Sequence, residues 1–296
     1  MSSFVFLVNP ASGGGAAPEA VVPVARRLRD HGASVEVTYS PGPEACLALV
    51  AEAVGRGDVV VSVGGDGMLS SIAGAVAQHG GTLGIVPAGR GNDFARMLGI
   101  PKDPMAQADV LLAGHRRSVD LIAYGDRLVA GSVYAGVDAR AAEIVDNARW
   151  VPKVAQYPLA ALRALATYTP ACYQVTIDGV AREFNGATVV VANSGYYGKG
   201  MHIAPAALVD DGLLDIIVIE AASRRGLMRS LPKVYDGGHV ALDEVHVFTG
   251  TSVTLSATSR RPVPVGGDGE ALGVLPSSQS APATVSVRPG ALTVIA

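Results

Sequence analysis

The sequence has few cysteines and no long run of basic residues. Its two cysteines, Cys46 and Cys172, are far apart in apolar contexts, which favours buried thiols over a disulfide or a catalytic cysteine. The net charge is −3, and no stretch of lysine and arginine is long enough to follow a phosphate backbone. These absences favour a protein of the reducing cytoplasm that does not bind nucleic acid.

Long apolar runs are also absent. The longest stretches, such as LLDIIVIEAA from Leu213, are about half of the roughly 20 residues that a membrane-spanning helix needs, and Asp215 and Glu220 interrupt this one. The amino-terminal stretch MSSFVFLVNPASGG has neither a basic head nor a cleavage site, so we expect no signal peptide. Any membrane contact is therefore expected to be peripheral.

Valine-rich runs alternate with helical patterns over the first part of the chain. Strand patterns at 4–8, 35–39, 59–63 and 83–86 are separated by helical patterns at 18–31, 43–55 and 68–78. Strands that are apolar on both faces and joined through helices predict a parallel sheet covered on each side. We therefore expect residues 1–120 to form a Rossmann-like open α/β domain.

The rhythm changes after about residue 120. Strand-like runs separated by turns follow, and helical patterns occur mainly at 139–168 and 223–235. This order predicts a mostly antiparallel β-sandwich over residues 121–296. The cleft between the two domains is the expected place for a small molecule.

Three polar loops follow strands of the predicted α/β domain. They are Asn9-Pro10-Ala11-Ser12-Gly13-Gly14-Gly15, Gly64-Gly65-Asp66-Gly67 and Pro87-Ala88-Gly89-Arg90-Gly91-Asn92-Asp93. Loops at the carboxyl ends of parallel strands should converge at one edge, where backbone N–H groups and helix N-termini can hold phosphate. Each loop alone can be a plain connection, and Asn92 or Asp93 can be only an N-cap.

The loops lack two common phosphate-binding signatures. The phosphate-loop pattern GxxxxGK[ST] is absent. The dinucleotide pattern G-x-G-x-x-G also fails, because Gly13 and Gly15 are followed by Pro18 at the position of the third glycine, and this disfavours hydride chemistry. Asp66 would repel a bare phosphate, so it indicates a role through Mg²⁺ or in ordering the loop by accepting backbone hydrogen bonds. A nucleoside triphosphate with its metal is the expected ligand.

The tetrapeptide GGDG occurs a second time, at 266–269. This copy follows VPV and has no amphipathic helix after it, so Asp268-Gly269 predicts a hairpin turn that presents Glu270 at the tip of a strand. If the tip faces the cleft, Glu270 can take the proton from an attacking hydroxyl. A solvated glutamate beside a turn is the alternative.

A third acidic stretch, Asp210-Asp211-Gly212-Leu213-Leu214-Asp215, precedes a predicted strand. Carboxylates and carbonyls around a glycine turn suit a hard divalent cation. A turn that only leads into the strand is equally consistent with the pattern.

In this order the motifs resemble the diacylglycerol kinase catalytic-domain family of bacterial lipid kinases, which includes the sphingosine and ceramide kinases. The resemblance spans residues 9–270 and is carried by NPASGGG, VGGDGMLSSIAGAV, PAGRGNDFAR, MHIAPAALVDDGLLDI and GGDGEAL. It implies transfer of the γ-phosphate of ATP, with Mg²⁺, to a lipid hydroxyl. Diacylglycerol giving phosphatidic acid is the reaction that it favours.

The resemblance also implies roles for single residues. Glu270 would be the proton acceptor, and Asp66 would belong to the Mg·ATP network. The implied nucleotide site consists of Asn9, Pro10, Ala11, Ser12, Gly13, Ser40, Gly64, Gly65, Asp66, Gly67, Met68, Leu69, Ser70, Arg90 and Asn92. The implied metal site, built partly from backbone oxygens, consists of Leu208, Asp211 and Leu213.

Two positions depart from the family pattern. Many relatives have the pattern G-T-x-N-D, and this chain has Arg90 at the position of the threonine. The Arg90 guanidinium can clamp phosphate or point to solvent. Lys199 stands in a stretch that is usually richer in glycine, and its role stays open.

The expected partner is a lipid with a free hydroxyl. A predicted helix carrying Arg224, Arg225, Arg229 and Lys233 can rest on anionic headgroups or be a solvated face. We expect a cytoplasmic enzyme at the inner face of the membrane, and a homodimer is left open. The alternatives are a soluble-substrate kinase of the NAD kinase type and a non-catalytic nucleotide-binding protein.

Overall fold

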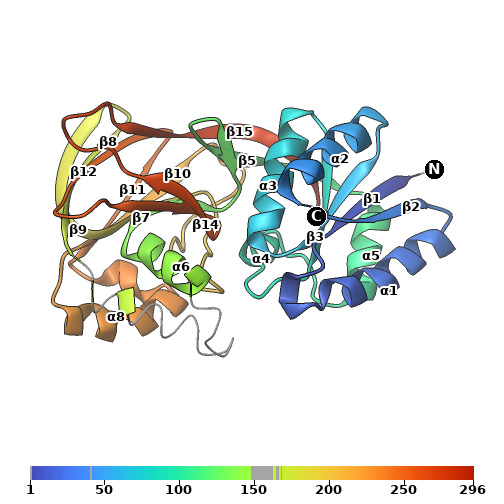
Figure 1. Cartoon of the computed structure of the whole chain (residues 1–296), viewed down its shortest axis with the longest axis horizontal. Coiled ribbons are helices and arrows are strands. Elements are labelled where there is room, and N and C mark those ends of the chain that lie inside the picture. The colour runs from blue at the N-terminus through green and yellow to red at the C-terminus, as the bar shows by residue number, and fades with distance from the viewer. Residues whose placement is uncertain (1, 41, 148–162, 165–166, 168) are drawn as a thin grey trace.

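The computed structural model describes every residue except 1, 41, 148–162, 165–166 and 168. Figure 1 shows a helix-rich amino-terminal domain beside a domain made mostly of strands, with β5 (Arg116–Tyr124) and β15 (Ala283–Ile295) running between them. The predicted fold class, an α/β domain followed by a mostly antiparallel β domain, is confirmed.

The amino-terminal domain has a parallel sheet with strand order β2-β1-β3-β4. Its elements are β1 (Ser3–Val8), α1 (Ala17–Asp30), β2 (Ser34–Tyr39), α2 (Pro43–Gly55), β3 (Val59–Gly64), α3 (Asp66–Gln78), β4 (Thr82–Pro87), α4 (Asp93–Met97) and α5 (Pro104–Ala113), with a short 3-10 helix at Ser12–Gly14. The predicted strands and helices agree with these bounds within two residues.

Each face of this sheet has its own core, because successive side chains of a strand point to opposite faces. On β1, Val5 and Leu7 belong to the core under α2 and α3. Phe4, Phe6 and Val8 belong to the core under α1 and α5. The helices therefore cover both faces and leave the carboxyl ends of the strands free to carry loops.

The second domain is built around β9 (Val180–Ala192), which pairs with β8 (Ala171–Ile177) and, through its later residues, with β7 (Ser132–Gly136) and β10 (Leu214–Glu220). The other elements are β6 (Arg127–Val129), α6 (Val137–Asn147), α8 (Arg224–Asp236), β11 (Val245–Gly250), β12 (Ser252–Thr258), β13 (Pro264–Gly267) and β14 (Glu270–Val274), with a 3-10 helix at Gly238–Ala241. The latter part of the predicted helical stretch 139–168 lies largely outside the described residues.

The last strand joins the two domains. β15 pairs with β12 in the second domain and with β5 along most of its length, and its end runs parallel to β4. Leu292 and Val294 are fully buried in the core under α2 and α3. The expected division near residue 120 falls within β5, and the end of the chain completes the first sheet. Among the described residues, no helix is long and apolar enough to span a membrane.

Candidate active site

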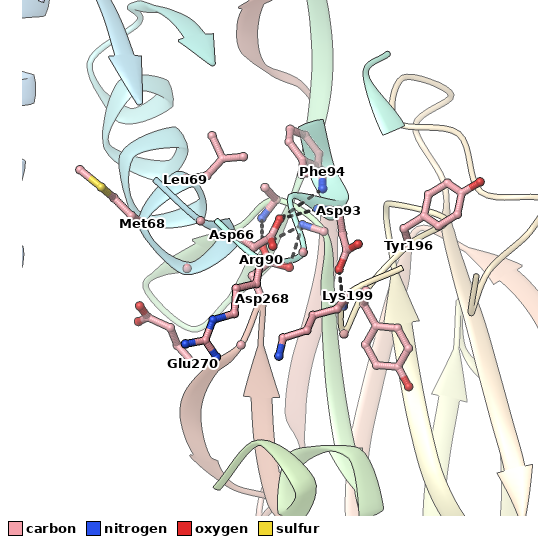
Figure 2. A pocket seen from close by; sticks show the side chains of 18 of the residues that line it. Asp66, Met68, Leu69, Arg90, Asp93, Phe94, Tyr196, Lys199, Asp268 and Glu270 are labelled. Carbon is pink, nitrogen blue, oxygen red and sulfur yellow. Dashed lines mark hydrogen bonds between the residues drawn. The ribbon is translucent and has the colours of Figure 1, made fainter. Parts of the chain in front are cut away.

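A cavity of about 370 Å³ lies where the loops of the first domain meet those of the second (Figure 2). The first domain contributes the ends of β1, β3 and β4. The second contributes the turn between β6 and β7, the loop after β9 and the hairpin between β13 and β14. The lining residues are Asn9, Ser12, Gly65, Asp66, Gly67, Met68, Leu69, Arg90, Gly91, Asp93, Phe94, Ala130, Gly131, Tyr134, Tyr196, Tyr197, Gly198, Lys199, Asp268, Gly269 and Glu270.

The loops after β1, β3 and β4 pack directly on one another. The Ser12 hydroxyl accepts a hydrogen bond from the N–H of Gly65, at 3.2 Å. The backbones at Gly65 and Gly89 approach so closely that a Cβ on Gly89 would lie 2.3 Å from the Gly65 Cα. Gly13, at φ 62°, leaves no room for a Cβ beside the Ala88 carbonyl. The three loops therefore converge at one sheet edge.

Asp66 orders the loop that follows β4. Its Oδ2 accepts the N–H of Asn92 at 2.8 Å, and its Oδ1 accepts the N–H groups of Asp93 and Phe94 at 2.7 and 3.4 Å. The carboxylate thus holds the first turn of α4 from the first residue of α3. The Asn92 side chain closes the same loop by bonding both backbone groups of Gly89, and no side-chain N-cap bond is present.

Asp93 is a second, buried carboxylate beside Asp66. Its Oδ2 accepts the N–H of Lys199 at 2.8 Å, whereas its buried Oδ1 has no hydrogen-bond partner among the described residues. Burial, and then the charge of Asp66, raise the pKa of Asp93 to about 6. The Arg96 guanidinium is 3.7 Å from Oδ1. The sequence placed Asp93 in the third candidate phosphate-binding loop, with an N-cap as the alternative, and did not reveal its contact with Lys199 of the second domain.

Because the pKa of Asp93 is raised in the folded state, ionisation of this carboxyl should lower the free energy of unfolding when no metal is bound. A carboxyl whose pKa is higher in the folded state stabilises the protein below its unfolded pKa, and this contribution is lost as the pH rises through about 6. In EDTA, we expect Asp93→Asn to gain up to about 3 kcal/mol in free energy of unfolding relative to wild type between pH 4 and pH 8. Urea unfolding at the two pH values measures this difference. Asp126→Asn, at an exposed turn, is the control, and an equal gain there would contradict the assignment.

Two cations face the same cavity from different domains. Arg90 comes from the loop after β4 and Lys199 from the loop after β9, and Figure 2 shows both side chains extending into the cavity. Burial, followed by the like charge of Arg90, lowers the pKa of Lys199. The Lys199 backbone has φ 72°, a left-handed conformation that the sequence did not reveal. The cavity therefore combines carboxylates with paired cations.

Glu270 reaches the cavity from the second GGDG. Asp268 and Gly269 have φ 47° and 89°, which forms the predicted hairpin turn between β13 and β14. The Glu270 carboxylate lies over the start of α3, where a Cβ on Gly67 would be 3.0 Å from its Oε1 (Figure 2). The side chain is exposed at the cavity edge. The two GGDG copies thus meet across the domain interface.

The two aspartates of the repeated tetrapeptide do the same structural work. Asp268 accepts the N–H groups of Ala130, Gly131 and Ser132 at 2.9 to 3.1 Å, just as Asp66 accepts three successive N–H groups of another loop. The Tyr134 hydroxyl accepts the N–H of Gly269 at 3.1 Å. These bonds fix the hairpin that presents Glu270. Sequence reasoning missed this role of Asp268, although the repetition of GGDG was a signal for it.

Some predicted nucleotide residues do not line the cavity. Ser70 accepts the N–H of Ala130 at 3.1 Å and lines a neighbouring cavity of about 390 Å³ that also includes Gly67 and Glu270. Ser40 follows β2, and its N–H bonds the Val8 carbonyl. The predicted residues absent from the lining are Pro10, Ala11, Gly13, Ser40, Gly64, Ser70 and Asn92. Their assignment to a nucleotide stays a prediction.

The predicted metal turn lies before β10, away from the cavity lining. Asp211 Oδ1 accepts the N–H of Leu213 at 3.0 Å, and the Asp120 carboxylate accepts the N–H of Gly212 at 2.7 Å. Burial, and then the charge of Asp211, raise the pKa of Asp215 to about 6. Within the described part of the chain, no three His, Cys, Asp or Glu side chains gather as metal ligands. The site at Leu208, Asp211 and Leu213 therefore stays a prediction.

Comparison with known proteins agrees with this architecture. Residues 3–124 match the family model "Diacylglycerol kinase catalytic domain", and residues 131–296 match "YegS C-terminal NAD kinase beta sandwich-like domain". A crystal structure of a diacylglycerol kinase from Bacillus anthracis str. Sterne has the same fold, with a TM-score of 0.76 and 21% identity over 99% of this chain and 96% of that one.

Two curated sequences are similar along most of their length. "Diacylglycerol kinase" of Mycobacterium tuberculosis (strain CDC 1551 / Oshkosh) is 34% identical over 95% of this chain and 93% of its own. "Probable lipid kinase YegS-like" of Pseudomonas fluorescens is 30% identical over 91% and 87%. The chain belongs to the family of diacylglycerol kinases and YegS-like lipid kinases.

Proposed function

We propose that the protein transfers the γ-phosphate of ATP to the hydroxyl of a lipid, and that diacylglycerol, giving phosphatidic acid, is the acceptor. One observation carries the proposal: Glu270 of the second domain and Asp66 of the first line a single cavity at the start of α3. A carboxylate that faces a phosphate-binding helix N-terminus is placed to receive the proton of an attacking alcohol.

The amino end of α3 supplies the phosphate-binding elements. The backbone of Gly65, Asp66 and Gly67 opens toward the cavity, and the partial positive charge at the helix start favours an anion there. Arg90 and Lys199 add two positive charges from opposite domains. Together they offset the charge of a triphosphate, whose binding would otherwise be opposed by the nearby carboxylates.

Asp66 and Asp93 fit a role in holding Mg²⁺. The two carboxylates are close enough that both would contact a Cβ placed on Gly91, and the buried Asp93 Oδ1 is without a hydrogen bond in the described structure. Oxygen ligands of this kind are those that Mg²⁺ takes. When bound, the ion would offset negative charge on the phosphate oxygens.

Glu270 is the proposed acceptor of the proton that the lipid hydroxyl loses in the reaction. The acceptor oxygen forms a bond to the γ-phosphorus, the bond from that phosphorus to the β,γ-bridging oxygen breaks, and ADP leaves. The hydroxyl proton passes to the Glu270 carboxylate. Since little covalent chemistry is required of the protein, most of the acceleration comes from positioning and charge compensation.

The acceptor is tested with γ-labelled ATP and a panel of diacylglycerol, sphingoid base, ceramide, undecaprenol and NAD. We expect label in the lipid extract, with diacylglycerol the best acceptor. Label in NAD alone would replace the lipid assignment with a soluble-substrate kinase. Absence of label from every acceptor, with ATP still bound, would favour a non-catalytic nucleotide-binding protein.

Arg90 is expected to contact the nucleotide. Arg90→Gln removes a charge-assisted contact to phosphate, so we expect the KM for ATP to rise about tenfold with a smaller change in kcat. Steady-state kinetics at saturating lipid measure both parameters. Arg90→Lys keeps the charge but loses the planar, forked geometry of the guanidinium. Its KM for ATP should lie between the values for wild type and Arg90→Gln. An unchanged KM in Arg90→Gln would show that Arg90 does not contact the nucleotide.

We also propose peripheral contact with the membrane that holds the lipid. Arg229 and Lys233 are exposed on α8, and basic residues near an anionic surface each contribute about 1 kcal/mol. The side chains of Arg224 and Arg225 lie outside the described residues. The proposed contact of a cytoplasmic enzyme with the inner membrane face rests on this helix.

A further inference from the structure

One face of α3 packs against the second domain, and Figure 1 shows this helix on the side of its domain that faces the strands. Gly67, Ser70 and Gly74 lie on that face, because residues three and four apart in a helix are neighbours on its surface. Each of the three faces a different part of the second domain: the Glu270 side chain, the Asp268 carboxylate and β6.

The two glycines allow the domains to approach closely. A Cβ on Gly74 would lie 3.3 Å from the Cβ and from the carbonyl oxygen of Leu128 in β6, which is tighter than an ordinary van der Waals contact. A Cβ on Gly67 would lie 3.0 Å from the Glu270 carboxylate. The backbone of α3 therefore lies directly against β6 and against the side chain at the tip of the β13–β14 hairpin.

Ser70 stands between the two glycines and forms hydrogen bonds with the second domain. Its Oγ accepts the Ala130 N–H at 3.1 Å, and its hydroxyl donates to the Asp268 carboxylate. The Ala130 N–H is shared with Asp268 Oδ2, at 3.0 Å. The Ser70 side chain is buried, with 8% of the residue exposed. It is therefore bonded to the same carboxylate that fixes the hairpin two residues before Glu270.

We infer that Ser70 is a positioning residue for Glu270 and not a ligand of the nucleotide. Through Asp268, the Ser70 hydroxyl ties the hairpin to the helix whose amino end is proposed to hold phosphate. The proton acceptor and the phosphate group then keep a fixed separation, as reacting groups require. The inference rests on the proposed role of Glu270. It agrees with the absence of Ser70 from the lining of the active-site cavity.

Steady-state kinetics of Ser70→Ala separate the two roles. We expect kcat for transfer from γ-labelled ATP to fall about 10- to 100-fold and the KM for ATP to stay within about twofold of wild type, because a small displacement of a reacting group is sufficient for such a loss. Ser70→Thr keeps the hydroxyl and should restore most of kcat. A raised KM for ATP with unchanged kcat in Ser70→Ala would make Ser70 a nucleotide ligand and overturn the inference.

Ser256→Ala is the matched control. Ser256 is also buried, and its hydroxyl donates to the Gln174 side chain at 3.1 Å within the second domain. Its loss should lower stability as the loss of the Ser70 hydroxyl does, but it should leave kcat unchanged. In the Glu270→Gln background, Ser70→Ala should cause no further fall in kcat, because the positioned group is already missing. A full additional fall there would contradict a role through Glu270.

Hydrogen exchange tests the link to the hairpin without any reaction. We expect the backbone amides of residues 130–132 and 266–272 to exchange faster in Ser70→Ala than in wild type or Ser256→Ala. Unchanged exchange at these residues would overturn the inference, whatever the activity. If the wild-type protein labels no acceptor, or if Glu270→Gln keeps the wild-type kcat, the proposed function fails, and the exchange result still decides whether Ser70 fixes the hairpin.

Discussion

Replacing Glu270 with glutamine is expected to lower kcat by a factor between about 10² and 10⁴, the range typical for removal of a general base. The amide keeps the shape of the side chain but cannot accept the hydroxyl proton. The KM for ATP should change little, because the groups proposed to bind phosphate are the α3 amino end, Arg90 and Lys199. Transfer of label from γ-labelled ATP to diacylglycerol measures the effect.

Two comparisons separate a proton acceptor from a structural role. Glu270 is exposed, and the hairpin beneath it is held by Asp268 and Tyr134, so the melting temperature of Glu270→Gln should equal that of wild type. Glu183→Gln, on an exposed stretch of β9 in the same domain, should leave kcat unchanged. A Glu270→Gln enzyme with wild-type kcat would remove the base from the mechanism, whatever its stability.

The sequence predicted the elements of the first domain because its signals are local. The alternation of buried strands with helices predicts β1 to β4. The glycine-rich loops converge because the carboxyl ends of parallel strands lie at one edge of the sheet. The positive φ angles at Asp268 and Gly269 follow from a two-residue hairpin turn, which the DG dipeptide indicates. These predictions needed no knowledge of contacts distant in the chain.

What the sequence did not predict depends on such distant contacts. β15 reads as a strand, but its pattern does not say that its end pairs with β4 of the other domain. Asp93 is buried, and its Oδ2 accepts a hydrogen bond from the Lys199 N–H of the second domain. Gly13 matched a nucleotide-binding motif, yet its backbone packs on the Ala88 carbonyl. Motif position therefore indicated the candidate cavity but did not separate the residues that line it from those that support its loops.

Asp66→Asn is expected to damage both the loop and the chemistry. An asparagine has one acceptor oxygen where the carboxylate accepts N–H groups with both, so the amide group would face a backbone donor at α4. Loss of charge-assisted hydrogen bonds should lower the free energy of unfolding by about 2–4 kcal/mol. Activity should fall at least about 100-fold and require more Mg²⁺, because Asp66 also stands beside Asp93 as a candidate ligand.

Asp268→Asn separates these two effects, since Asp268 accepts three successive backbone N–H groups as Asp66 does. Both variants should lose comparable stability in urea unfolding. Only Asp66→Asn should raise the Mg²⁺ concentration that gives half-maximal activity. Asp268 fixes the Glu270 hairpin and is not one of the two proposed Mg²⁺ ligands. If both variants shift the Mg²⁺ dependence equally, Asp66 acts by ordering its loop alone, and the metal must be held elsewhere.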